Sequence, residues 1–229
     1  MKPVSGHIII KDQDNKFVFK PFVFFEEGFQ TVPLNEVMAY VISNVYGFNI
    51  VPHTKFDTVT LTFGNQEVTW EGSLQEYVQG GVIPAHLFTG NSFNPQDATK
   101  VFLLDVLIGN TDRKADNLLV TPEGSLWAID NGFSLGFHAE TERDKRNPNF
   151  YWNLSMYQIE NADLEIYPPL LEYIDYDYLH KLISKIQRTP FPFKTDETDD
   201  ALYIEVLNML RYRIKWLPTL VWKQFEDRR

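Results

Sequence analysis

The 229-residue chain contains no cysteine, which excludes a disulfide bond, a thiolate zinc site and a cysteine nucleophile. Long hydrophobic runs are also missing: the longest, at residues 101–108, is interrupted by Asp105 and is far too short to span a bilayer. Residues 1–6 lack the apolar run of a signal peptide. We therefore expect a cytoplasmic protein with no transmembrane segment.

Basic residues are scarce as well. Lys and Arg together number 21 against 31 Asp and Glu, so the net charge is −10. Nucleic acids and anionic lipid surfaces attract clustered Lys and Arg, so we expect no general nucleic-acid binding. Hydrophobic residues make up 44% of the chain, which is enough for a buried core in one large domain or two small lobes.

The first third of the chain is rich in strand signals. Alternating apolar and β-branched residues predict strands at 7–10, 17–22, 50–56, 59–63, 67–70 and 72–78. Apolar residues at helical spacing predict one helix at 34–46, ended by Gly47. Gly64-Asn65 is typical of a hairpin turn.

After Gly80-Gly81 the pattern becomes mainly helical, so we expect a boundary after residue 79. A helix should begin with Asn94 as N-cap and Pro95 in its first turn. Residues 134–153 are polar and aperiodic, which indicates a surface loop. Further helices are expected near 164–174, 175–188 and 198–226.

Three oxygen-bearing side chains in the middle of the chain have an informative spacing. Asp112 and Asn117 stand five residues apart in a polar loop. A short apolar strand, a turn and a second short apolar strand follow, and Asp130 stands at the end of the second strand. Phosphoryl transfer on the kinase scaffold needs one carboxylate facing the acceptor hydroxyl, with an amide oxygen and a second carboxylate holding Mg²⁺ against the ATP phosphates. We expect Asp112 to be the catalytic base, and Asn117 and Asp130 to be catalytic metal ligands. The alternative is that Asp112 and Asn117 are ordinary capping and turn residues.

These elements and this motif indicate an α+β protein with a two-lobed, protein-kinase-like fold. The N-lobe, residues 1–79, is small and β-rich with one main helix and a hinge at its end. The C-lobe, residues 80–229, is mostly helical and carries the catalytic loop and the metal-binding Asp.

Two residues of the N-lobe are candidates for binding the nucleotide phosphates. Lys20 lies in an otherwise apolar strand, where an unpaired buried ammonium is costly, and Glu36 lies in the first turn of the next helix. Lys20 could reach the ATP phosphates while paired with Glu36. Alternatively, Lys20 could point out of an edge strand, and Glu36 could simply complement the helix dipole.

Other candidate nucleotide contacts are less specific. Ser5 and Gly6 could form a short phosphate cover from backbone N–H groups, although the chain lacks a G-x-G-x-x-G loop and the pair could be a flexible terminus. Gln75, Glu76 and Tyr77 lie where the chain crosses between the expected lobes, where backbone groups could bond the adenine edge.

Charged residues near the catalytic motif have competing interpretations. Arg113 could neutralise phosphate charge or brace the loop. Asp105 could anchor that loop or satisfy its own helix face. Asp116 is off the expected spacing, and we assign it to surface solvation or capping.

The motifs together resemble the HipA-like and phosphatidylinositol 3-/4-kinase-like atypical kinases. The resemblance is carried by Phe-x-Phe-Lys-Pro at Lys20, Asn35-Glu36, Val51-Pro52, Asn-x-Asp-Arg-x-x-x-Asn and Ile-Asp-Asn-Gly, over about residues 5–136. It implies ATP and Mg²⁺, with Lys20 on phosphate, Glu36 as its partner, Asp112 as the catalytic Asp, and Asn117 and Asp130 on the metal. The lipid-kinase branch usually follows Asp-Arg with His, where this chain has Lys114.

We expect a kinase that phosphorylates Ser or Thr hydroxyls of a protein substrate. Autophosphorylation is plausible at Ser5, Ser134 or Thr141. The alternatives are a lipid or small-molecule kinase, a pseudokinase-like regulatory module that binds nucleotide with little turnover, and an enzyme that transfers an adenylyl group.

Overall fold

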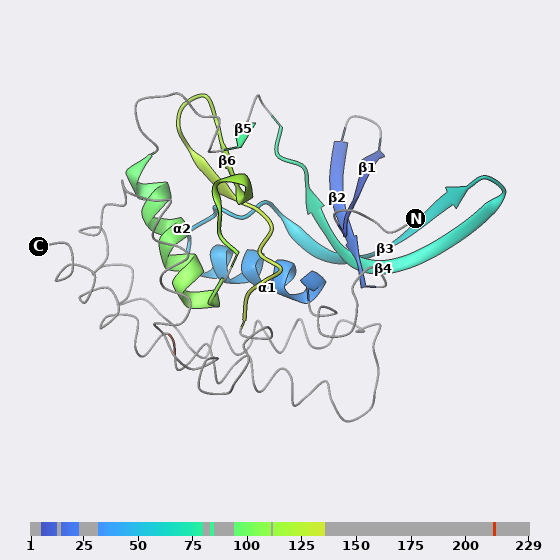
Figure 1. Cartoon of the computed structure of the whole chain (residues 1–229), viewed down its shortest axis with the longest axis horizontal. Helices are drawn as coiled ribbons and strands as arrows, with labels where there is room; N and C mark the ends of the chain where they lie inside the picture. Colours follow the sequence, from blue (N-terminus) through green and yellow to red (C-terminus); the bar gives the residue numbers. More distant parts are fainter. Residues whose placement is uncertain are drawn as a thin grey trace, which may run out of the picture.

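The computed structural model describes residues 6–12, 15–22, 32–79, 83–84, 94–110, 112–135 and 213. Within them the protein has mixed α/β structure (Figure 1). One sheet has four strands in the order β1-β2-β4-β3, and a smaller sheet has the order β5-β6-β7. The helices predicted at 164–174, 175–188 and 198–226 lie outside these residues, apart from Arg213, which is helical and fully buried.

The four-stranded sheet begins with a hairpin made by the first two predicted strands. β1 (Ile8–Asp12) and β2 (Asn15–Pro21) are antiparallel, with Ile8 opposite Phe19. β2 then pairs with β4 (Gln66–Glu76), which places Lys20 opposite Ser73. The sheet therefore presents Lys20 from a central strand and not from an edge.

The strands predicted at 50–56, 59–63, 67–70 and 72–78 are in fact two long ones. β3 (Thr54–Phe63) and β4 form a curved hairpin that extends beyond the other described elements (Figure 1). The ladder continues through polar Asp57, which lies opposite Gly72, because β-sheet pairing tolerates polar residues on an exposed ribbon. The predicted turn at Gly64-Asn65 is confirmed, with a positive φ at Gly64.

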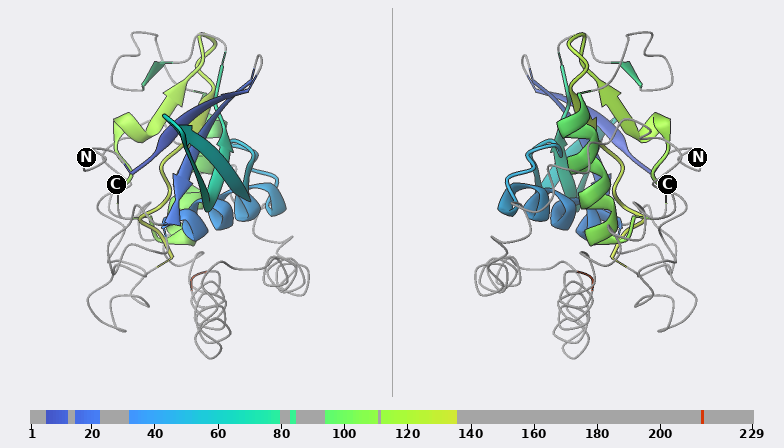
Figure 2. Two further views of the ribbon diagram at one scale, coloured as in Figure 1. Left: turned by 90° about the vertical axis from the view of Figure 1, so that its right-hand side faces the viewer. Right: turned by 90° about the vertical axis from the view of Figure 1, so that its left-hand side faces the viewer.

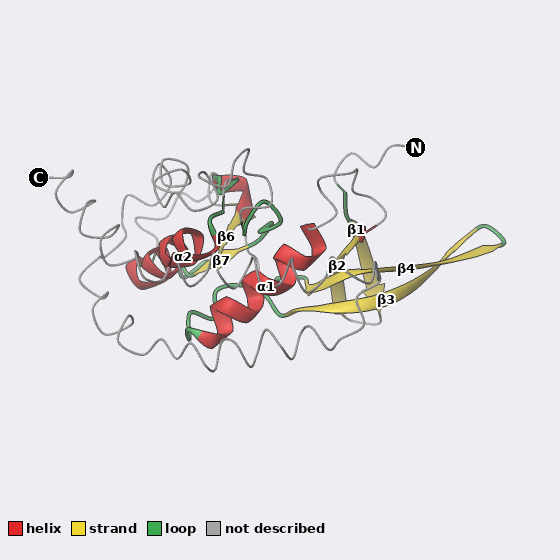
Figure 3. Ribbon diagram, turned by 90° about the horizontal axis from the view of Figure 1, so that it is seen from below, coloured by secondary structure: helices red, strands yellow, loops and turns green. Residues whose placement is uncertain are grey.

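Helix α1 (Val32–Val45) confirms the predicted helix and begins two residues earlier. Leu34, Met38 and Ile42 are almost completely buried, and Gly47 follows with a φ of +67°. Seen from below, α1 runs between the four-stranded sheet and the part that contains α2 and the small sheet (Figure 3). It therefore contacts both halves of the described structure.

Helix α2 (Pro95–Ile108) begins as predicted: the Asn94 side chain accepts hydrogen bonds from the N–H groups of Gln96 and Asp97. At its end, Gly109 has a φ of +61°, which turns the chain into the polar loop. The N–H of Leu135 donates to the Ile108 carbonyl over 2.6 Å. This bond joins the end of α2 to the segment that follows Asp130.

The loop after α2 leads through the short helix η3 (Ala115–Asn117) into β6 (Leu118–Val120) and β7 (Leu126–Ala128) (Figure 2). These are the two short apolar strands that the sequence predicted, and β6 also pairs with β5 (Ile83–Pro84). In the described ranges, no helix combines the length and apolar character that a membrane crossing requires.

We predict that Gly72→Ala destabilises the protein by about 3 kcal/mol, because overpacking against backbone has little room to relax. A Cβ at this position would lie 2.2 Å from the Lys20 carbonyl oxygen. The control is Gly64→Ala, which meets nothing within 4 Å and should cost only about 1 kcal/mol of backbone strain at its positive φ. Urea unfolding measures both, and equal losses would contradict the packing argument.

Candidate active site

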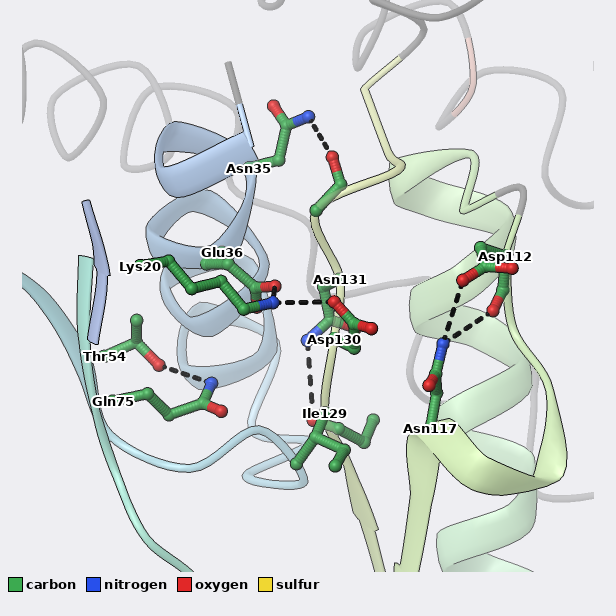
Figure 4. Close-up of polar contacts among 12 residues, drawn as sticks. Lys20, Asn35, Glu36, Thr54, Gln75, Asp112, Asn117, Ile129, Asp130 and Asn131 are labelled. Carbon is green, nitrogen blue, oxygen red and sulfur yellow. Dashed lines mark hydrogen bonds and ion pairs between the residues drawn. The ribbon is translucent and has the colours of Figure 1, made fainter. Parts of the chain in front are cut away.

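Lys20 joins the two halves of the described structure. Its ammonium group contacts Glu36 Oε1 on α1, and it lies 2.6 Å from Asp130 Oδ1 beyond β7 (Figure 4). The Lys20 side chain is 11% exposed and that of Glu36 only 2%. The structure thus pairs the lysine and the glutamate that the sequence singled out, and adds Asp130 as a third member.

Charge holds this cluster together. Burial by itself lowers the pKa of Lys20, but the carboxylates of Glu36 and Asp130 outweigh it and raise the pKa above its ordinary value. Partial burial opposes ionisation of Asp130, but Lys20 lowers the pKa of that carboxyl below its ordinary value. The cluster is therefore one ammonium shared between two carboxylates.

Asp130 also has an unusual backbone. Its φ is +54°, in the left-handed region that non-glycine residues rarely occupy. Such a conformation persists only where the surroundings hold it, and it is enriched at functional sites. It aims the Asp130 carboxylate at Lys20.

The candidate base and a candidate metal ligand lie side by side. The Asn117 amide Nδ2 donates to the Asp112 carbonyl over 2.8 Å and to Asp112 Oδ2 over 3.2 Å (Figure 4). Lys114 Nζ lies 3.0 Å from the same Oδ2, and this interaction with Asp112 raises the pKa of Lys114. The Asn110 side chain accepts from the Asp112 N–H, which fixes the loop around the candidate base.

Arg113 braces the loop, which decides between its two interpretations. Its side chain is fully buried and bonds both carboxylate oxygens of Asp105 on α2. It also donates to the backbone carbonyls of Asn117 and Ile129 and to the Asn131 side chain. Asp105 accordingly anchors the loop. Burial raises the pKa of Asp105 above its ordinary value, although Arg113 acts in the opposite direction.

A cavity of about 330 Å³ lies between the four-stranded sheet and the β6–β7 strands. Six of the predicted site residues line it: Lys20, Asn117 and Asp130, together with the predicted hinge residues Gln75, Glu76 and Tyr77. The lining also includes five aliphatic residues, Ile9, Val18, Val78, Leu119 and Ile129. Asp112 is absent from this lining but contacts Asn117, which belongs to it.

The remaining predicted site residues have different positions. Gln75 is mostly buried, and its amide donates to the Thr54 hydroxyl over 2.9 Å. Ser5 lies outside the described residues, while Gly6 is described, with a φ of +63°. Asp116 is exposed, and Ser134 is 1% exposed.

The donor set fits a hard divalent cation. Because Nδ2 of Asn117 faces Asp112, its Oδ1 is free of that contact, and Asp130 supplies a carboxylate in the same cavity. Among the described residues no group of three or more His, Cys, Asp or Glu forms a metal cage. Two protein oxygens with substrate phosphates are a usual environment for Mg²⁺.

Two parts of this site were not predicted from the sequence. The aliphatic walls come from strands where alternation alone could have placed Ile9 and Val18 on one face. Asn35 bonds the Gly132 and Ser134 carbonyls, and no local pattern announces such a long-range contact.

We predict that Arg113→Ala costs about 3–5 kcal/mol of unfolding free energy, because it leaves the buried Asp105 carboxylate without its partner. The control is Lys114→Ala, whose ion pair is partly exposed and should be worth at most about 1 kcal/mol. Urea unfolding measures both. Similar losses for the two variants would contradict the bracing role.

The lowered pKa of Asp130 predicts an acid-dependent part of the stability. A carboxyl with a lowered native pKa stabilises the fold above its unfolded value of 3.8, and this contribution is lost as the pH falls through the native value. The difference in unfolding free energy between wild type and Asp130→Asn should therefore be constant near neutral pH and shrink in acid. A difference independent of pH would refute the ion pair.

Comparison with known families identifies the chain. The family model "Phosphatidylinositol 3- and 4-kinase" matches residues 29–156. Among solved structures, the N-terminal 618-residue fragment of LepB from Legionella pneumophila is similar at 14% identity and a TM-score of 0.41, over 90% of this chain. This chain spans 46% of that fragment. No curated protein matches. Because the family model covers more than half of the 229 residues, the chain belongs to the phosphatidylinositol 3- and 4-kinase family, a family of phosphotransferases that use ATP and a divalent metal.

Proposed function

We propose that the protein transfers the γ-phosphoryl group of ATP, with Mg²⁺, to a Ser or Thr hydroxyl of a protein. The observation that carries the proposal is Lys20 held between Glu36 and Asp130 in the wall of a cavity that Asn117 also lines. A cation suited to phosphates and two oxygen groups suited to a metal therefore lie near one another, and this supports the proposal.

The nucleotide would lie in the cavity with its adenine between aliphatic side chains. Ile9 and Val18 come from β1 and β2, and Leu119 and Ile129 come from β6 and the residue after β7. Backbone groups of residues 75–77 would bond the adenine edge. In this proposal the nucleotide would lie between the two predicted lobes, 1–79 and 80–229.

Each polar residue has a separate role in the proposed reaction. Lys20 binds the phosphates, and Glu36 keeps its ammonium group in place. Asn117 and Asp130 would hold Mg²⁺, which neutralises the phosphate charge when bound. Asp112 orients the acceptor hydroxyl and accepts its proton as the oxygen bonds to the γ-phosphorus and the bond to the β–γ bridging oxygen breaks. The products are the phosphorylated acceptor and ADP.

Charge supports a protein acceptor. The net charge of −10 opposes approach to an anionic membrane surface. Lys114, beside Asp112, also stands where lipid kinases usually have His. The second candidate is a lipid kinase, and it is favoured by the family description itself.

The test is incubation with radiolabelled ATP and Mg²⁺, with either a protein extract or vesicles that contain phosphatidylinositol. We expect label on protein Ser or Thr, and Asp112→Asn should lower turnover by about 10²–10⁴-fold, the usual contribution of a positioned base. Asp116→Asn is the matched control, because this neighbouring carboxylate is exposed and outside the cavity lining, and it should keep turnover.

The outcomes separate the candidates. Label in the lipid fraction alone would replace the protein acceptor with the lipid one. Equal losses in Asp112→Asn and Asp116→Asn would contradict the assignment of the base. Absence of transfer together with tight ATP binding would favour a regulatory nucleotide-binding module, and an adduct with the mass of AMP would indicate adenylyl transfer.

A further inference from the structure

Asn35 makes buried hydrogen bonds that have no role in the reaction proposed above. It lies in the first turn of α1, next to Glu36, and its side chain is fully buried. Its amide Nδ2 donates to the Gly132 carbonyl over 2.5 Å (Figure 4) and to the Ser134 carbonyl over 3.1 Å. One side chain therefore satisfies two buried carbonyls nearly a hundred residues away in the chain.

The same helical turn packs directly against the segment that it bonds. A Cβ on Gly132 would lie 2.5 Å from Val32 Cγ1, so α1 comes as close as only glycine permits. Gly132 is two residues after Asp130, whose positive φ needs support from its surroundings. The contacts of Asn35 and Val32 provide support at the point where the chain leaves Asp130.

Glu36 supports the side chain of Asp130, whereas Asn35 and Val32 support the backbone that follows it. It holds Lys20, which in turn contacts Asp130 Oδ1. Two successive residues of α1 thus reach the Asp130 segment by independent routes, one through the lysine and one through the backbone. Any shift of this turn would change both.

We propose that Asn35 is a positioning residue that clamps residues 132–134 onto α1 and so holds the Asp130 carboxylate where a metal-bound triphosphate needs it. This inference rests on the proposed function. A residue that only satisfied buried carbonyls would affect stability alone. A positioning residue also affects how strongly the metal improves nucleotide binding.

The experiment uses the full chain and compares Asn35→Ala with Ser43→Ala. Ser43 is a suitable control because it lies on the same helix, is 1% exposed and accepts a hydrogen bond from the Ile50 N–H. Ser43→Ala therefore also removes a buried hydrogen bond to the backbone, but at a position away from Asp130. If Asn35→Ala does not fold, as judged by thermal unfolding, Asn35→Ser is measured in its place.

The first readout is the ratio of ATP dissociation constants in EDTA and in Mg²⁺. We expect this ratio to fall about fivefold in Asn35→Ala, the equivalent of about 1 kcal/mol or one hydrogen bond, and to stay unchanged in Ser43→Ala. The second readout is hydrogen exchange without nucleotide or metal, which should become faster at residues 132–135 in the Asn35 variant alone.

The outcomes are distinct. If wild type binds ATP no better in Mg²⁺ than in EDTA, the proposed function itself fails, and the inference falls with it. If wild type shows the metal effect and Asn35→Ala keeps it, the inference fails while the proposed function stands. Equal losses in both variants would show that Asn35 has only a structural role.

Discussion

The ammonium group of Lys20, shared between Glu36 and Asp130, is the interaction on which the rest of the site depends. Glu36 is almost completely buried, so its charge is tolerated only because Lys20 is present. Asp130 is more exposed, with 43% of its side chain accessible, which suits a group that must exchange one cation partner for another. The fold brings these three residues together because α1, which carries Glu36, lies between the strand that carries Lys20 and the segment that carries Asp130.

A second buried ion pair, Asp105 with Arg113, fixes the opposite wall. Replacing a buried pair by apolar residues is often neutral for stability, so specificity is the better explanation for its presence. Arg113 joins α2, the loop after it and the residues on either side of Asp130 through five acceptor atoms in four groups. Lys20 thus joins the two halves, while Arg113 orders one of them internally.

Features that depend on local chemistry could be predicted from the sequence. The Asn94 cap, the turn at Gly64 and the helix that Gly47 follows can all be predicted from short patterns, and the structure confirms them. The Lys20–Glu36 contact could be proposed because a charged residue in an apolar strand must find a partner. The strand boundaries within 50–78 could not be predicted. Polar residues such as Asp57 look like breaks in the sequence, but they are paired within one continuous strand. The contacts of Asn35 and the bracing by Arg113 depend on packing between distant segments, which spacing along the chain does not encode.

The most direct test of the account is a crystal structure with a non-hydrolysable ATP analogue and Mg²⁺. The account predicts the triphosphate beside Lys20 and the metal on Asn117 Oδ1 and the Asp130 carboxylate. It predicts the adenine between Val18 and Leu119, with its edge bonded to the backbone of residues 75–77. A nucleotide bound elsewhere, or this cavity left vacant at saturating nucleotide, would contradict it.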